Sequence, residues 1–494
     1  MQYKIHQEPE QVFHFFEIIS AIPRGSGNEK GIADYLVSFA KERNLFCVRD
    51  EWNNVFIRRP GKGKGESSPA LAFQGHVDMV CEKLSTVAHD FEKEGIDLVL
   101  GEDGWLRANG TTLGGDDGIA VAMMLAMLDG NLPDSYPPLE ILFTTNEEVG
   151  LTGATGFDYR LLTADRLINL DSEEESFICV GCAGGVRTDL RVQKTKDPEP
   201  FTGKAVSVQI RKLMGGHSGN EINSNRTNAI KLMGRLLSGL QKDMPFRLLS
   251  IDGGLKDNAI PRECEAVLSG ADAEGAKAQL KKLSEAVLFE LRQPLSSDQD
   301  VEIQIQDAKA DTKPWSGEIT RQIIAFISGI QNGVLCMSRQ IPNLVEFSRN
   351  FGIIRTEKEQ IVMSFSTRSA IETQLDASMS ELESIALCMG WKVKHRGRYP
   401  GWAFKEDSVV RAKYIAKCKE LLGTDVGFGV IHAGLECGII SGKKPGMDMI
   451  SVGPDMKNIH TPEEALSLSS CARIWTVLQS LILDACDWKT GGKN

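Results

Sequence analysis

Three apolar, strand-like segments, each followed by acidic or histidine side chains, place the strongest constraint on the fold of this chain. The segments span residues 71–73, 139–145 and 167–170. A helix-like segment, residues 119–128, lies between the first two and is almost wholly apolar, so we expect it to be buried. Strands that alternate with helices favour an α/β fold with a mostly parallel central sheet flanked by helices.

The side chains that follow these segments are of the types that bind metal ions or transfer protons. His76 follows the first strand, Glu147 and Glu148 follow the second, and Asp171 ends the third. Functional sites in such sheets lie just beyond the carboxyl ends of the strands, so we expect these side chains to meet there. Two adjacent carboxylates repel each other unless a cation or a proton lies between them.

Further residues extend this set. Asp78 lies two residues after His76, on the same side of an extended segment, and can therefore orient the imidazole as a metal ligand. Asp116 lies in the glycine-rich turn 114–118, where the dipole of the following helix favours a carboxylate. His460 precedes a helix-like segment near the C-terminus. Taken singly, these residues fit simpler roles better than a metal site: a loop pair for His76 and Asp78, an acidic helix cap for Asp116, and a capping or core histidine for His460. Together, their nitrogen and oxygen atoms suit zinc or manganese better than copper or an iron–sulfur cluster.

The middle of the chain has a different pattern. From about residue 188 to residue 399, strands and amphipathic helices follow in the order of the ferredoxin-like β-α-β-β-α-β unit, and a second approximate copy begins with a helix at 319–330. After residue 400 the first pattern returns. We therefore predict one α/β domain, split into residues 1–187 and 400–494, and an inserted α+β domain, residues 188–399, built from duplicated ferredoxin-like units.

Composition and charge argue against several classes of partner. The chain has 56 Lys and Arg residues against 67 Asp and Glu residues, and its net charge of −11 does not provide the broad cationic surface that nucleic acid or an anionic membrane favours. No apolar run approaches the roughly 18 residues of a membrane helix, and the N-terminus lacks a signal-peptide pattern. We expect a cytoplasmic protein with neither nucleic-acid nor membrane partners.

The 11 cysteines are scattered and do not indicate a disulfide framework. Cys179 and Cys182 form a C-x-x-C pair, but no second ligand pair follows that would complete a structural zinc site. We expect both to be reduced residues of the core.

Five motifs, in this order along the chain, closely resemble those of the aminoacylhistidine dipeptidases, a branch of the aminoacylase and glutamate carboxypeptidase superfamily of two-metal peptidases. The motifs are FQGHVDMV (73–80), TLGGDDG (112–118), TTNEEVG (144–150), NLDSE (169–173) and GGHSG (215–219). Two further motifs, HAGLECG (432–438) and IHTP (459–462), extend the resemblance over essentially the whole chain.

The resemblance implies a site for two divalent metal ions, which we expect to be zinc, with manganese or cobalt as possible substitutes. Asp116 would bridge the two ions. His76 and Asp171 would complete one site, and Glu148 and His460 the other.

The resemblance also implies roles in catalysis. Glu147 would be the general base that takes a proton from a water held between the two metals, Asp78 would orient His76, and His217 on the inserted domain would stabilise the oxyanion. In this superfamily the peptide bond after the bridging carboxylate is often cis. The residue that follows it is often Asn, and Asp117 departs from that pattern.

The inserted domain would recognise the substrate. Arg368 would clamp the terminal carboxylate of a short peptide, Asn258 would donate an amide, and Gly434 would offer a backbone N–H. The domain would then act as a lid that excludes water, and family likeness implies a homodimer formed through it. We predict a metal-dependent dipeptidase that acts on short unblocked peptides, Xaa-His among them. The alternatives are an N-acyl amino-acid deacylase or a tripeptidase on the same scaffold, and a non-catalytic metal-binding protein.

Overall fold

The computed structural model of the chain describes residues 5–194, 204–309 and 313–488. The chain forms two compact units. The first, here called the split unit, comprises Met1–Cys182, Trp402–Val430 and Leu435–Asn494. The second, the inserted unit, comprises Ala183–Gly401 and Ile431–Gly434. Among the described residues, no helix combines the length and the apolar character that crossing a membrane requires.

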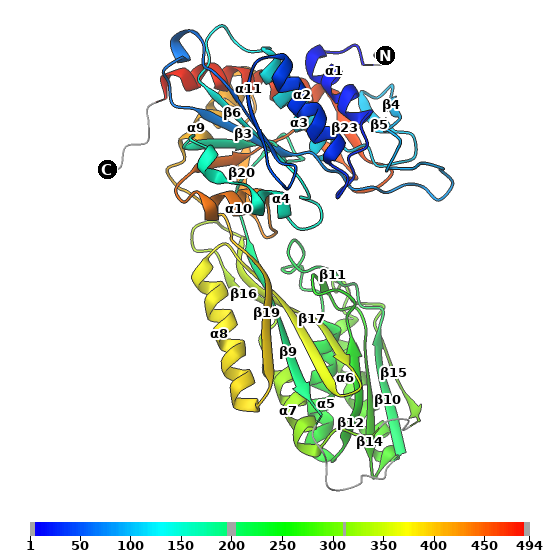
Figure 1. Cartoon of the computed structure of the whole chain (residues 1–494). Coiled ribbons are helices and arrows are strands. Elements are labelled where there is room, and N and C mark those ends of the chain that lie inside the picture. The colour runs from blue at the N-terminus through cyan, green and yellow to red at the C-terminus, as the bar shows by residue number, and fades with distance from the viewer. Residues whose placement is uncertain (1–4, 195–203, 310–312, 489–494) are drawn as a thin grey trace. The chain divides into compact units, whose positions relative to one another are not determined.

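The split unit is built around an eight-stranded sheet with the order β1-β2-β6-β3-β7-β21-β8-β20 (Figure 1). The strands are β1 (Phe46–Arg49), β2 (Val55–Arg59), β3 (Leu71–His76), β6 (Leu139–Thr144), β7 (Arg166–Asn169), β8 (Phe177–Cys182), β20 (Gly427–Ile431) and β21 (Asp448–Ser451). This confirms the predicted α/β fold. The central strands β6, β3, β7 and β21 are parallel, whereas β1, β2 and β8 pair in antiparallel fashion. The sheet is thus mixed at its flanks, because a short turn between β1 and β2 can only form an antiparallel hairpin.

Helices of the split unit share a hydrophobic core with this sheet. They are α1 (Glu10–Ser20), α2 (Lys30–Glu42), α3 (Gly115–Asp129), α9 (Val409–Leu422) and α11 (Leu468–Asp484). The shorter helices are α4 (Thr152–Gly156), α10 (Glu436–Lys443) and the 3-10 turns η1 (Gly63–Gly65), η2 (Tyr159–Leu161) and η3 (Ala485–Asp487). Helix α3 is buried from Gly115 to Leu128 and packs against α1 and β3, as its apolar sequence predicts.

A second sheet of the split unit has four strands in the order β22-β23-β5-β4. Its strands are β4 (Leu98–Leu100), β5 (Trp105–Ala108), β22 (Met456–Lys457) and β23 (Ala465–Ser467). Leu466 lies opposite both Met456 and Leu106. The loop between β22 and β23, which carries His460, is therefore fixed at both ends.

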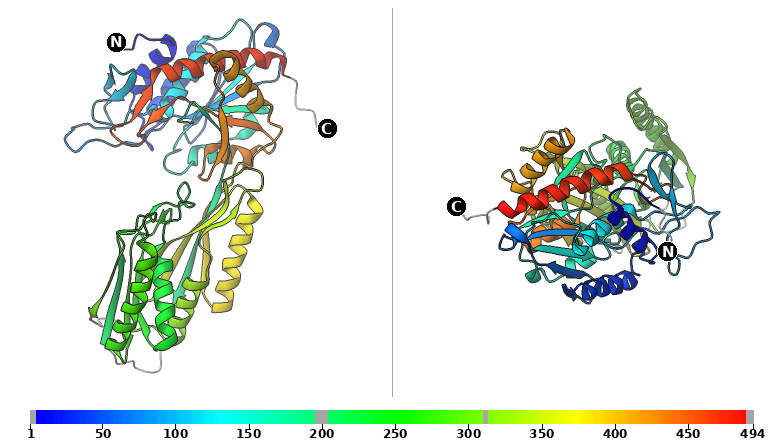
Figure 2. Two further views of the ribbon diagram at one scale, coloured as in Figure 1. Left: turned by 180° about the vertical axis from the view of Figure 1, so that it is seen from behind. Right: turned by 90° about the horizontal axis from the view of Figure 1, so that it is seen from above.

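The inserted unit contains a nine-stranded sheet with the order β15-β10-β14-β12-β17-β18-β9-β19, and β16 pairs with β17 (Figures 1 and 2). The strands are β9 (Gly184–Gln193), β10 (Lys204–Arg211), β12 (Arg247–Gly253), β14 (Cys264–Gly270), β15 (Glu302–Ala308), β16 (Gly333–Met337), β17 (Val345–Thr356), β18 (Gln360–Ser369) and β19 (Lys392–Tyr399). The helices α5 (Ala229–Asp243), α6 (Ala273–Leu291), α7 (Gly317–Gly329) and α8 (Glu372–Met389) form one hydrophobic core with it.

The sheet consists of two ferredoxin-like units joined edge to edge. The first runs β10-α5-β12-β14-α6-β15, and its strands lie in the order β15-β10-β14-β12. The second has the matching order β19-β9-β18-β17. Its first strand, β9, precedes the first unit in sequence, so the prediction that the second copy begins at 319–330 is wrong. The reason is a long-range pairing, because β9 is hydrogen-bonded to β18 from Gly184 to Gln193.

Candidate metal centre and a polar cluster in the inserted unit

Three predicted ligands meet at the carboxyl ends of the parallel strands in the split unit. His76 is the last residue of β3, Asp171 follows β7, and Asp116 lies in the first turn of α3. The Nε2 atom of His76 lies 3.0 Å from Oδ1 of Asp116 and 3.5 Å from Oδ1 of Asp171. The imidazole is 1% exposed, so this group is enclosed by the fold.

A second group forms on the other side of Asp116. The Nε2 atom of His460 lies 3.1 Å from Oδ2 of Asp116 and 3.0 Å from Oε1 of Glu148. Asp116 therefore turns one carboxylate oxygen to each histidine, which is the arrangement that a bridging ligand requires.

The donor set fits two divalent cations. The ligand atoms within each group lie within 4.8 Å of one another, and each group combines imidazole nitrogen with carboxylate oxygen, as zinc prefers. Burial and the charges of Asp116 and Glu148 raise the pKa of Asp171 to about 6. Burial and the same carboxylates, with Asp171, raise the pKa of Glu173 to about 7. Carboxylates that lie this close together repel one another unless cations lie between them.

Asp78 is buried behind His76 and holds the adjacent acidic residues Glu147 and Glu148 in place. Its Oδ1 atom lies 3.4 Å from Nδ1 of His76 and accepts the N–H of Glu147 at 3.1 Å. Its Oδ2 atom accepts the N–H of Glu148 at 3.4 Å and the hydroxyl of Ser26 at 2.8 Å. Burial opposes ionisation, yet the hydrogen bonds from His76, Ser26 and Glu147 hold the pKa of Asp78 below its ordinary value. Asp78 thus links the segment after β3 to the segment after β6.

Glu147 follows β6 and lies beside the two groups of candidate metal ligands. Its carboxylate comes near both His76 and Glu148, with which it forms a third cluster of ligand atoms. Burial, together with the charges of Asp171 and Glu436, raises the pKa of Glu147 well above its ordinary value. A raised pKa favours proton uptake, which is the property that a general base needs.

The Asp116–Asp117 peptide bond is cis, as the resemblance implies. Asp117 is fully buried, and its Oδ2 atom accepts the backbone N–H of His76 at 3.2 Å. Burial and the charge of Asp171 raise the pKa of Asp117 well above its ordinary value.

His217 lies in the inserted unit, in the two-residue strand β11 (Gly216–His217), which pairs with β13 (Ala259–Ile260). Its Nδ1 atom accepts the backbone N–H groups of Gly219 at 3.3 Å and Asn220 at 3.2 Å. A neutral imidazole that accepts at Nδ1 must carry its proton on Nε2. Burial and the positive charge of Arg368 lower the pKa of His217, so this neutral donor form is favoured.

Arg368 lies near the end of β18 and is 7% exposed. Its Nη1 atom donates to the hydroxyl of Tyr399 at 3.0 Å, and its buried Nε has no hydrogen-bond partner among the described residues. Ser348 lies directly opposite Arg368 on β17, and its hydroxyl is 2.7 Å from Nε2 of His432. Burial and the charge of Arg368 lower the pKa of His432 to about 3.

The other two predicted substrate contacts also lie in the inserted unit. The carbonyl of Asn258 accepts the N–H of Ser218 at 2.9 Å, so Asn258 neighbours His217 in the chain fold. Gly434 faces Tyr399, and a Cβ atom at Gly434 would lie 2.8 Å from the Tyr399 ring. Asn258, Gly434, His217 and Arg368 thus all belong to the inserted unit, whereas the seven other predicted site residues belong to the split unit.

Several buried residues around these sites were not predicted from the sequence. His432, which binds Ser348, was quoted only as part of a motif. Glu436 is fully buried and accepts hydrogen bonds from Gln74 at 2.5 Å and Thr144 at 2.6 Å. Burial raises the pKa of Glu436 to about 8. Arg24 and Glu464 contact the backbone of the ligand segments and are described below.

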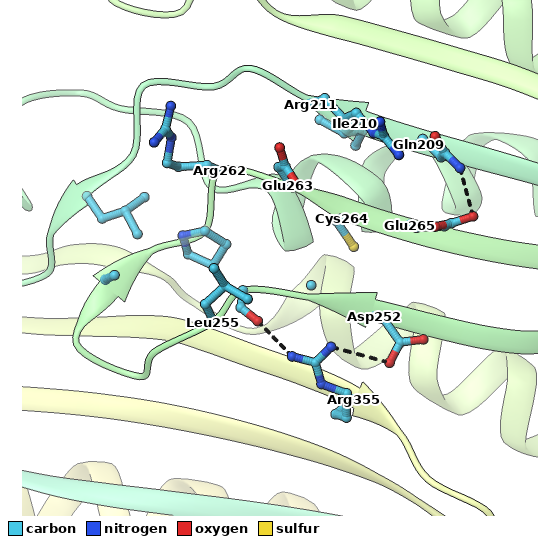
Figure 3. A pocket seen from close by; sticks show the side chains of 15 residues that line it. Gln209, Ile210, Arg211, Asp252, Leu255, Arg262, Glu263, Cys264, Glu265 and Arg355 are labelled. Atoms are coloured by element: carbon cyan, nitrogen blue, oxygen red, sulfur yellow. Dashed lines mark hydrogen bonds and ion pairs between the residues drawn. The ribbon is translucent and has the colours of Figure 1, made fainter.

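Two features outside these clusters have no direct role in them. Cys179 and Cys182 are buried, and no disulfide joins them in the described part of the chain, as predicted. A hollow of about 430 Å³ on the inserted unit is lined by charged, polar and apolar residues (Figure 3). Glu265 accepts a hydrogen bond from Gln209 at 2.9 Å, and Arg355 lies 4.0 Å from Asp252. None of the predicted site residues lines this hollow.

Comparisons with known proteins find a matching family model and similar chains. Residues 72–484 match the model of peptidase family M20/M25/M40. The chain is 33% identical to the cytosol non-specific dipeptidase of Escherichia coli strain K12, over 96% of this chain and 97% of that protein. It is 32% identical to the aminoacylhistidine dipeptidase of Vibrio alginolyticus, with a TM-score of 0.89 and 97% of each chain covered. The aminopeptidase PepT of Bacillus cereus has a TM-score of 0.55 at 14% identity, over 97% of this chain and 99% of that one, a likeness of fold alone.

Proposed function

Because this chain belongs to peptidase family M20/M25/M40, we propose that it hydrolyses short unblocked peptides, Xaa-His dipeptides among them, and releases their C-terminal amino acid. The family and the dipeptidase class inferred from the motifs are confirmed, since the relatives in Escherichia coli and Vibrio alginolyticus are dipeptidases that match nearly the whole chain. The chain is therefore a metal-dependent dipeptidase and a hydrolase. Its substrate range and the roles of its residues are our proposals.

The observation that carries the proposal is the placement of Asp116 between two histidines. Its two oxygens lie 3.0 and 3.1 Å from the Nε2 atoms of His76 and His460. We assign His76, Asp116 and Asp171 to one metal ion, and Asp116, Glu148 and His460 to the other. We expect zinc, with manganese or cobalt as substitutes. When bound, these ions supply Lewis acidity toward water and toward the peptide carbonyl.

We assign the proton transfers to Glu147. Its carboxylate takes a proton from the attacking water and then delivers a proton to the leaving amine. The N–H groups of Glu147 and Glu148 are both held by Asp78, at 3.1 and 3.4 Å. The general base and a metal ligand are therefore positioned by one buried carboxylate, which also faces Nδ1 of His76.

We assign substrate recognition to the inserted unit. The Nε2–H of His217 serves as a donor to the developing oxyanion. The Nε of Arg368, which has no hydrogen-bond partner among the residues that the structure describes, is available for a carboxylate, while Tyr399 holds the other end of the guanidinium. Asn258 and Gly434 offer an amide and a backbone N–H. We also propose a cytoplasmic location, as the name of the Escherichia coli relative states for that protein, and a homodimer formed through this unit.

The test is hydrolysis of a peptide panel by the purified protein before and after chelation. We expect activity on free Xaa-His and other dipeptides, loss of activity in a chelator, and recovery with zinc, manganese or cobalt. Activity on N-acetyl amino acids or on tripeptides alone would favour the deacylase or tripeptidase alternative. Turnover that is indifferent to chelation would contradict the metal assignment.

A further inference from the structure

Glu464 lies four residues after His460, and its carboxylate contacts the start of α3, the segment that carries Asp116. Glu464 is 2% exposed. Its carboxylate accepts the backbone N–H groups of four consecutive residues at the start of α3. Oε2 accepts from Leu113 at 2.8 Å and Gly114 at 3.1 Å, and Oε1 accepts from Gly115 at 2.8 Å and Asp116 at 3.4 Å. The segment that carries Asp116 is thus fixed by a residue from the segment that carries His460.

The start of α3 needs this external acceptor. The first N–H groups of a helix have no partner within the helix, and a side chain at the N-cap position usually accepts from them. Here the N-cap residue is Gly114, which has no side chain to do so and has a φ of 67°. A carboxylate is also the group that the positive end of the helix dipole favours. Glu464 therefore supplies both the acceptors and the charge.

Arg24 contacts the same segment from its carbonyl side and is also 2% exposed. Its Nη2 atom donates to the carbonyl of Gly114 at 2.5 Å, and its Nη1 atom donates to the carbonyls of Val77 at 3.0 Å and Asp78 at 3.4 Å. The guanidinium therefore joins the start of α3 to Val77 and Asp78, which directly follow His76 at the end of β3.

The glycines of the TLGGDDG motif explain how Arg24 reaches this position. A Cβ atom on Gly114 or on Gly118 would lie 2.5 Å from Nη2 of Arg24, so a side chain at either position would displace the guanidinium. Two of the motif's glycines thus leave room for the buried guanidinium of Arg24, besides allowing the turn. Arg24 in turn lies near the negative charges of Glu464 and Asp78, so neither the guanidinium nor the Glu464 carboxylate is left without a counter-charge.

We propose that Glu464 and Arg24 are positioning residues that hold the ligand segments of His76, Asp116 and His460 together, and that Glu464 sets the affinity of the site for metal through Asp116. The inference rests on the metal assignment of the proposed function. Both residues act on the backbone of the ligand segments, Glu464 through N–H groups and Arg24 through carbonyl groups. Groups that orient metal ligands in this way typically change metal affinity by about 10- to 100-fold when they are replaced.

The test compares Glu464→Gln with Glu140→Gln in the full-length protein. Glu140 is the matched control because it is also fully buried in the split unit and accepts backbone N–H groups, from Thr163 at 2.7 Å and Ala164 at 2.9 Å. Zinc affinity is measured by competition with a chromophoric chelator, and the stability of the metal-free protein by thermal unfolding. We expect Glu464→Gln to bind zinc about 10- to 100-fold more weakly. Saturating zinc should restore most of its turnover. Both variants should lower the unfolding temperature, while Glu140→Gln keeps the zinc affinity of the unsubstituted protein.

The outcomes distinguish a failure of the positioning role from a failure of the metal assignment. Unchanged zinc affinity in Glu464→Gln, or an equal loss in Glu140→Gln, would overturn the positioning role while leaving the metal site in place. An unsubstituted protein that binds no zinc, manganese or cobalt would overturn the metal assignment itself. If Glu464→Gln does not fold, Glu464→Asp, which keeps the charge but shortens the reach to α3, provides the same comparison.

Discussion

The two units of the molecule carry site residues of opposite electrical character. In the split unit, carboxylates surround His76 and His460 at the ends of parallel strands, and burial raises the pKa of Asp171 and Glu147. In the inserted unit, burial and Arg368 lower the pKa of His217 and His432 beside an antiparallel sheet. The first arrangement suits cations, and the second suits a carboxylate or an oxyanion. If this division is correct, variants of the split unit change metal binding or proton transfer, whereas variants of the inserted unit leave the metal content unchanged.

The largest effect on turnover is expected for Glu147→Gln. The amide keeps the shape of the side chain but cannot accept the proton of the attacking water, so kcat should fall by about 10²- to 10⁴-fold. Steady-state kinetics with a dipeptide, combined with metal analysis of the same sample, measures both quantities. Metal content should remain at the level of the unsubstituted protein, and near-normal kcat would contradict the role of the base.

His217→Ala is the corresponding test in the inserted unit. Removal of one donor to the oxyanion typically lowers kcat by about 10²- to 10³-fold, and KM should change little. Because His217 accepts N–H groups at Nδ1, His217→Gln, which can still donate a hydrogen bond, should recover part of the rate. An effect confined to KM, or a loss of bound metal, would break the division between the two units.

Arg368→Met should act on binding rather than on chemistry. A hydrogen bond to a charged group contributes about 1.5–3 kcal/mol, so KM for a dipeptide should rise by about 10- to 150-fold while kcat stays within a few-fold. A dipeptide with an amidated C-terminus is the control, because it lacks the carboxylate and should be cleaved similarly by both proteins. Equal sensitivity of the two substrates to the substitution would rule out the carboxylate clamp.

The smallest effect is a pH dependence of stability in the inserted unit. The pKa of His432 is about 3 in the folded unit, because burial and Arg368 oppose its charged form, against about 6.5 in an unfolded chain. The unfolded state therefore binds more protons, and the contribution of His432 is present above pH 6.5 and is lost as pH falls toward 3. The slope is at most about 1.4 kcal/mol per pH unit.

Hydrogen exchange in β17 and β18, corrected for the intrinsic pH dependence of exchange, measures this slope. His432→Gln should flatten it between pH 5 and 6.5. An identical slope in the variant would show that His432 is not the titrating group.

The sequence predicted the regions in which local pattern determines structure. The apolar runs 71–73, 139–145 and 167–170 became central strands, and the apolar helix 119–128 is buried as expected. The acidic and histidine side chains beyond these strands lie together, because parallel strands expose their carboxyl ends at one edge. A pattern of this kind needs no knowledge of distant pairing.

The remaining features depend on contacts between distant parts of the chain. β9 completes the second ferredoxin-like unit by pairing with β18, and no local pattern specifies that pairing. Among the described residues, Arg24 donates its hydrogen bonds to backbone carbonyls, which every residue has, so no motif marks its partners. Glu464 stands four residues after His460 and could have been noticed, but its target at the start of α3 is about 350 residues away in sequence.

The most direct test of the account is the metal content of Asp116→Asn. The account holds that each oxygen of Asp116 serves a different ion, and an asparagine offers only one oxygen. After dialysis against metal-free buffer and loading with zinc, the unsubstituted protein should retain two ions per chain by inductively coupled plasma mass spectrometry, and Asp116→Asn should retain fewer. Two ions held with unchanged affinity in Asp116→Asn would contradict the bridging site.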